Sequence, residues 1–69
     1  MTRDELILSA LARGEASTAE LVELTDIPER RCRKGLRRLV RDNYVWSPAR
    51  GRWRVTRRGR EIVSELPTV

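Results

Sequence analysis

Arginine is the residue type in this sequence with the clearest capacity for chemistry. Of the 15 lysine and arginine residues, thirteen lie between Arg30 and Arg60, a segment in which Asp42 is the sole acidic residue. Residues 1–26 carry instead two cations and six anions. Crowding like charges into one segment costs stability through repulsion, and a small domain does not need such segregation to fold. The pattern therefore predicts a polyanionic partner.

The guanidinium group presents a planar fork of donors that matches phosphate oxygens and the edge of guanine. The cationic side chains of two predicted elements are therefore our candidate nucleic-acid contacts. A predicted helix over residues 28–42 carries Arg30, Arg31, Arg33, Lys34, Arg37, Arg38 and Arg41. The tip of a predicted hairpin, residues 47–53, carries Arg50 and Arg52, and Arg54 follows in the second strand.

The sequence offers few residues from which another kind of functional site, catalytic or metal-binding, could be built. The chain has no histidine and one cysteine, Cys32, which excludes an internal disulfide and a cysteine-based zinc site and removes the commonest general base. The carboxylates fall on separate predicted solvent faces with no pocket to bury them. We therefore predict no enzymatic activity, no cofactor and no metal. Cys32 lies in an apolar stripe, so we expect a small buried hydrophobe rather than a redox switch.

Length and composition set further limits. A chain of 69 residues, 39% hydrophobic and without Phe, suffices for one domain over residues 1–69 with a thin core, and leaves no room for an enclosed small-molecule site. No apolar run approaches the roughly 20 residues of a membrane span, and no signal peptide is evident. The net charge of +5 favours nucleic acid or an anionic membrane surface as partner, and the placement of the charge on a predicted helix and hairpin favours nucleic acid. We expect no membrane association and a cytoplasmic, nucleoid-associated protein.

The acidic first third of the chain predicts two helices. Apolar residues recur at helical spacing between Arg3 and Arg13, and Gly14 is a natural C-terminal stop. After a very short strand at residues 15–16, a capping box formed by Ser17 and Glu20 opens a second helix that ends near Thr25.

The third helix follows after a tight turn at Asp26, a residue type that tolerates left-handed backbone. Pro28 is expected to be its first helical residue, because a fixed φ suits a helix start. The helix should end near residues 42–43. Its apolar stripe has the spacing expected of a buried face and comprises Cys32, Leu36, Leu39 and Val40.

A hairpin and a last helix complete the chain. Residues 44–47 and 53–55 are rich in strand formers, and they flank a loop of five residues in which Pro48 ends the first strand and Gly51 supplies positive φ. Thr56 is the expected cap of a helix over residues 57–66. Gly59 weakens that helix and suggests close packing. Three aromatic residues of the hairpin are expected to pack in the core or across the strands, with base stacking as the alternative. They are Tyr44, Trp46 and Trp53.

This order of elements resembles the winged helix-turn-helix transcriptional regulators, a class that includes MarR-like and PadR-like proteins. Residues 17–28 are similar to the second helix and turn of that class, residues 42–45 to its step into the wing, and residues 55–61 to the Leu-Thr-x-x-Gly-Arg-Glu phrase that opens its last helix. Asp26 and Asn43 stand where the class usually has glycine, and both types can adopt left-handed backbone.

The resemblance implies a mainly α fold with a small β-hairpin: a three-helix core, a wing and a C-terminal helix. It implies binding of double-stranded DNA, with the helix over residues 28–42 in the major groove and the wing over 47–53 on the backbone or in the minor groove. Near the helix start, Arg30, Arg33, Lys34 and Arg37 are expected to reach base edges, and the other candidates to meet phosphate. The long dimerisation helices of MarR-like regulators are missing, so a homodimer through the first and last helices stays open.

Two alternatives remain at this stage. The chain could be an RNA-binding, ribosome-associated or nucleoid-associated structural module, which would bind without sequence preference. It could instead be a protein-interaction domain, such as a phage factor that targets an acidic surface of a host enzyme, because the same fold can carry unrelated functions.

Overall fold

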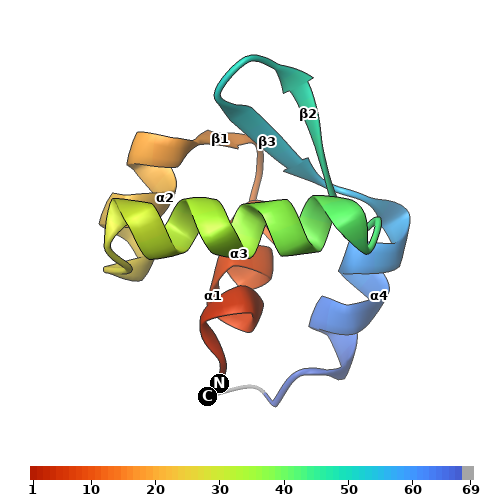
Figure 1. The fold of residues 1–69 in the computed structure, drawn as a ribbon. Helices are drawn as coiled ribbons and strands as arrows, with labels where there is room; N and C mark the ends of the chain where they lie inside the picture. Colours follow the sequence, from red (N-terminus) through yellow and green to blue (C-terminus); the bar gives the residue numbers. More distant parts are fainter. Residues whose placement is uncertain (68–69) are drawn as a thin grey trace.

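Four helices and one three-stranded antiparallel sheet form residues 1–67 of the chain, which a computed structural model describes (Figure 1). Residues 68 and 69, the end of the predicted domain, lie outside the described residues. The elements in chain order are α1 (Arg3–Ala12), β1 (Ala16–Ser17), α2 (Thr18–Thr25), α3 (Glu29–Arg41), β2 (Val45–Ala49), β3 (Arg52–Val55) and α4 (Arg57–Glu65). The predicted mainly α fold with a small hairpin is confirmed.

Local side-chain signals decide where α1, α2 and α4 begin. Ser17 caps α2 as predicted: its hydroxyl accepts from the Glu20 amide at 3.1 Å, and the Glu20 carboxylate accepts from the Ser17 amide at 2.9 Å. That backbone hydrogen bond also lowers the pKa of Glu20. Thr56 caps α4 through the Gly59 amide at 3.0 Å, again as predicted. Thr2 and Glu5 form a second capping box at the start of α1.

The turn between α2 and α3 and the turn that leads from α3 into the wing both use left-handed backbone. Asp26 has φ of 58° and Asn43 has φ of 64°, as the sequence predicts. The prediction for Pro28 was wrong. It is the N-cap of α3 and not its first helical residue, because its ψ of 142° is extended while its carbonyl already accepts from the Cys32 amide at 2.9 Å.

The wing is tighter than the sequence suggested. The connection between β2 and β3 is the two-residue turn Arg50–Gly51, not a loop of five, and Gly51 has the expected positive φ of 72°. Pro48 does not end β2 but lies within it. β2 is an edge strand in the order β1-β3-β2, where a residue without an N–H is tolerated. The register of β2 against β3 shifts between Trp46 and Ala49.

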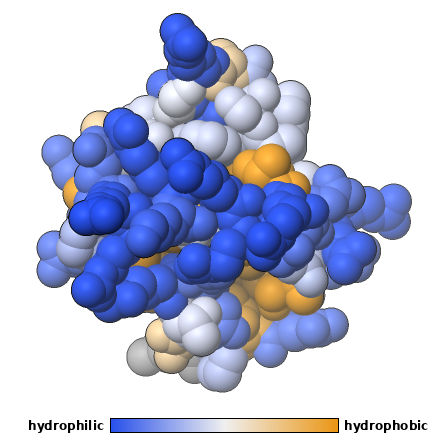
Figure 2. Space-filling view, in the orientation of Figure 1, coloured by the Kyte–Doolittle hydropathy of each residue, from blue (hydrophilic) through white to orange (hydrophobic). Residues whose placement is uncertain are grey.

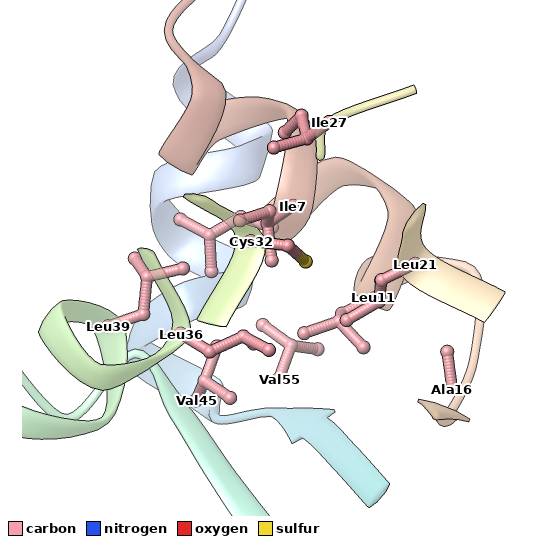
Figure 3. Packing of buried hydrophobic residues seen from close by; sticks show 11 residues of the cluster. Ile7, Leu11, Ala16, Leu21, Ile27, Cys32, Leu36, Leu39, Val45 and Val55 are labelled. Atoms are coloured by element: carbon pink, nitrogen blue, oxygen red, sulfur yellow. The ribbon is translucent and has the colours of Figure 1, made fainter. Parts of the chain in front are cut away.

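The core lies between α1, the inner face of α3 and the base of the wing. Figure 3 shows side chains from these elements and from α2 directed into one cluster. Its members are Ile7, Leu8, Leu11, Ala16, Leu21, Ile27, Cys32, Leu36, Leu39, Val45 and Val55. Three members of the predicted α3 stripe are therefore confirmed.

The prediction of a buried Val40 is wrong, and of the two positions predicted for Trp46, in the core or across the strands, the structure excludes the core. Val40 is 42% exposed, because it lies one residue beyond Leu39 and the turn of the helix carries it off the buried face, where Gly35 packs instead. Trp46 is 47% exposed, because its neighbour Val45 takes the inward position and successive side chains of a strand point to opposite faces. Trp53 and Tyr44 pack against the core as predicted.

Candidate nucleic-acid interface

The exposed face of α3 gathers the predicted cationic side chains. With Cys32, Leu36 and Leu39 of α3 turned inward, all seven of its basic residues are exposed. Figure 2 shows the most hydrophilic residues crossing the middle of the molecule, where Figure 1 places α3. Because no helix neighbour covers this face, an extended anion could lie along it.

A groove separates α3 from the tip of the wing. It has a volume of about 420 Å³ and is open to solvent. Arg33 and Arg37 of α3 line it together with Arg50 of the wing turn. The rest of the lining comes from Thr18, Gly51 and Trp53. The structure thus brings together three of the ten predicted contacts, from two elements, around one concave surface.

Two predicted wing contacts, Arg52 and Arg54, lie on the other side of the sheet. Side chains alternate along β3, so Trp53 and Val55 face inward and these two arginines face outward. The Nε of Arg52 donates a hydrogen bond to the Glu15 carboxylate, and a terminal nitrogen of Arg52 lies 3.8 Å from the Glu20 carboxylate. Arg54 lies 4.0 Å from the Glu15 carboxylate. The hydrogen bond to Glu15 is the main reason that the pKa of Arg52 is raised. Both arginines are therefore paired within the fold.

Arg38 is also paired, with Asp4 of α1 at 2.9 Å, and the hydrogen bond raises the pKa of Arg38. Arg33 is 3.7 Å from Glu29, and Arg41 is 3.8 Å from Asp42. These last two pairs are largely exposed, so they compete weakly with a phosphate. Five predicted contacts form no ion pair within residues 1–67: Arg30, Arg31, Lys34, Arg37 and Arg50.

One cation near α3 was missed by the sequence reasoning. Arg3, at the start of α1, lines a shallow, mostly polar depression together with Arg31, Lys34 and Arg38. No signal in the sequence points to it, because Arg3 belongs to the acidic third of the chain. At the other end of α3, Arg58 lies over the ring of Tyr44, with its guanidinium carbon 5.1 Å from the ring centroid.

The aromatic residue in the groove is held by a hydrogen bond. The indole Nε1 of Trp53 donates to Thr18 Oγ1 at 2.9 Å, and the ring is half-buried against the core. Cys32 is fully buried, and burial raises the pKa of its thiol, which favours the protonated form at neutral pH. Within residues 1–67 no group of metal-ligating side chains gathers, and no helix there is long and apolar enough to cross a membrane.

No protein-family model matches this sequence, and a search of curated proteins finds no significant match. Two solved structures are similar to it over 94% of its length. The adhesin competence repressor AdcR from Streptococcus pyogenes has a TM-score of 0.82 at 18% identity, and the match covers 54% of that chain. BpsR from Bordetella bronchiseptica, whose DNA binding is regulated by 6-hydroxynicotinic acid, has a TM-score of 0.78 at 22% identity, with 52% covered.

The chain therefore spans about half the length of these neighbours. At this level of identity the likeness concerns the arrangement of helices and strands. The resemblance predicted from the sequence is confirmed for the architecture: this chain has the winged helix-turn-helix fold.

Proposed function

We propose that this chain is the DNA-binding module of a transcriptional regulator, with α3 in the major groove and the wing tip on the backbone or in the minor groove. The observation that carries the proposal is the exposed cationic face of α3 together with the groove that Arg33, Arg37 and Arg50 line. At 13 residues, α3 is roughly 20 Å long, and the major groove, about 12 Å wide, admits a helix.

The proposed contact set is smaller than the set of ten predicted from the sequence. Arg38, Arg52 and Arg54 are engaged by acidic side chains of the fold, so they are left out. Seven candidates remain: Arg30, Arg31, Arg33, Lys34, Arg37, Arg41 and Arg50. A single module of this size should bind with modest affinity and specificity unless it dimerises or works beside another domain.

Titration of duplex DNA at several salt concentrations tests the proposal. If the seven candidates neutralise about six phosphates, log K falls against log[salt] with a slope of about −5. Selection of bound fragments from random DNA then asks whether one sequence is preferred. A steep slope without any preference would favour the structural-module alternative, and a duplex RNA of equal length separates RNA from DNA binding. No binding to either duplex at low salt would overturn the proposal and favour a protein partner.

Further expectations of the proposal concern assembly and location. The module is expected to act without cofactor, metal or catalysis, in the cytoplasm with the nucleoid. A homodimer through α1 and α4 stays a prediction that sedimentation would test.

A further inference from the structure

The wing is attached to the rest of the fold by an acidic residue, although it belongs to the most cationic part of the chain. We infer that Glu15 is a positioning residue for nucleic-acid binding, which holds Arg52 and Arg54 so that Arg50 stays across one groove from Arg33 and Arg37. This inference rests on the proposed function and adds to it a requirement for a negative charge outside the contact surface.

Glu15 acts on the outer face of the sheet. One of its carboxylate oxygens accepts a hydrogen bond from Arg52, and the other lies 4.0 Å from Arg54. A single carboxylate therefore bridges both outward-facing residues of β3. Glu20 adds a weaker contact to Arg52 at 3.8 Å while it caps α2. The pairs are half-exposed, with 43% of the Arg52 side chain and 31% of the Glu15 side chain accessible.

The inner side of the wing tip is held by Thr18. Its amide donates to the Gly51 carbonyl at 3.2 Å, and its hydroxyl accepts from the Trp53 indole at 2.9 Å. The β1 ladder beside these contacts is short, with Ala16 opposite Trp53 and Ser17 opposite Arg52 as its only two pairs. The tip is therefore attached to α2 and β1 by few contacts. On the outer face, the ion pairs of residues 1–67 that reach β3 come from Glu15 and, at longer distance, from Glu20.

A stabilising contact of this kind is needed because the groove between α3 and the wing tip is lined by side chains of like charge. Arg50 faces Arg33 and Arg37 across it, and their mutual repulsion favours a wing that swings away from α3. The attraction of Glu15 for the outer face of β3 opposes that movement. Arg52 and Arg54 on the outer face of β3 thus hold the wing in place, while Arg50 at its tip stays available for phosphate.

A competing account assigns Glu15 the opposite role. In that account Glu15 only neutralises two arginines that would otherwise bind phosphate, so its removal should tighten DNA binding. General electrostatics predicts the same sign, because loss of any carboxylate raises the net charge of the protein. Positioning by Glu15 predicts weaker binding in spite of the added positive charge.

The test compares Glu15→Gln with Glu23→Gln in the full chain, by fluorescence anisotropy on one duplex at fixed salt. Glu23 is exposed and forms no ion pair within residues 1–67, so it reports the electrostatic effect alone. We expect E23Q to bind about twofold more tightly and E15Q about fivefold more weakly than the unaltered protein. Binding by E15Q that is as tight as that of E23Q would overturn the inference.

A double variant separates positioning from a general loss of stability. If E15Q acts by displacing the wing tip, it removes the Arg50 contact, so its salt slope is shallower by about one and Arg50→Ala adds little to it. Additive losses would contradict the inference. Thr18→Val and Thr18→Ser provide a second pair of variants, which tests the contacts on the inner side of the wing tip. T18V loses the hydroxyl that accepts from Trp53, so it should weaken binding more than T18S, which keeps that hydroxyl.

The outcomes also separate this inference from the proposed function. If the unaltered protein binds no nucleic acid at low salt, the proposed function fails. If the unaltered protein binds and E15Q binds at least as well, the proposed function stands and the positioning role of Glu15 fails.

Discussion

Arg38 of α3 donates two hydrogen bonds to the carboxylate of Asp4 in α1. Its Nε lies 3.2 Å from Oδ2, and a terminal nitrogen lies 2.9 Å from Oδ1. This two-point pair connects α1 and α3 through residues that are 34 positions apart in the chain. Gly35, one turn earlier on α3, leaves room for it, because a Cβ there would lie 2.9 Å from Asp4 Oδ1. Arg38 is thus a structural residue within a helix that otherwise presents cations to solvent.

The Asp4–Arg38 pair predicts that Arg38→Ala and Asp4→Asn lower the melting temperature to a similar extent. The double variant should melt no lower than either single one, because both changes break the same contact. DNA binding provides the second measurement. Arg38→Ala should reduce affinity no more than Arg13→Ala, which removes an exposed arginine at the C-cap of α1, outside the proposed contact set. A shallower salt slope for R38A, with D4N unchanged, would instead make Arg38 a phosphate contact.

The groove between α3 and the wing predicts different effects for its two walls. Arg33→Ala and Arg37→Ala should each weaken binding to a selected site by about 1–3 kcal/mol and relax its sequence preference, because a guanidinium fork can reach a guanine edge. Arg50→Ala should weaken all sequences about equally and lower the salt slope by about one.

Titrations of these variants against a selected and a scrambled duplex check that assignment. None of the three changes should shift the melting temperature appreciably, because the side chains are exposed. If Arg50→Ala altered the sequence preference while Arg33→Ala and Arg37→Ala did not, the wing and not α3 would read the bases, and the proposed docking would be wrong.

The burial of Cys32 predicts slow chemistry at its thiol. Its pKa is raised by desolvation, and no part of the side chain is accessible. Alkylating reagents should therefore label it slowly in the native protein and quickly in denaturant. Cys32→Ser should destabilise the fold by about 1–2 kcal/mol, because it buries a hydroxyl without an assured partner. Rapid labelling of the native protein would restore a redox role for Cys32.

Two helical glycines should respond differently to alanine. Gly-to-Ala changes inside helices usually stabilise by about 1 kcal/mol. At Gly59, however, a Cβ would lie 2.3 Å from the backbone oxygen of Tyr44, which cannot move away without disturbing the wing base. Gly59→Ala should therefore destabilise the protein by about 1–3 kcal/mol.

Gly35→Ala is the matched comparison in α3. Its Cβ would meet the side chains of Asp4 and Ile7, each at 2.9 Å, and side chains can yield where backbone cannot. We expect a smaller loss than for G59A in denaturant unfolding. Equal or greater stability of G59A relative to the unaltered protein would contradict the close approach of α4 to Tyr44.

Much of the fold was predictable because its signals are local. The capping boxes act over three residues, the left-handed turns depend on Asp26 and Asn43 themselves, and the inward face of α3 follows from helical spacing. The errors arose where tertiary packing chose among local options. A five-residue loop and the turn at Arg50–Gly51 are both compatible with the sequence, and Pro48 fits within β2 because that strand lies at the edge of the sheet.

By itself, the sequence determined that a cationic helix and hairpin follow an acidic pair of helices, because charge and periodicity belong to each segment alone. Only the tertiary structure decided which cations remain available. Arg38 meets Asp4 across 34 positions, and Arg52 meets Glu15 across 37. Ion pairs of such separation depend on how helices and strands pack, and no count of charges along the chain contains that information. The same packing brings Arg50 of the wing turn opposite Arg33 and Arg37 of α3, the helix that precedes the wing in the chain.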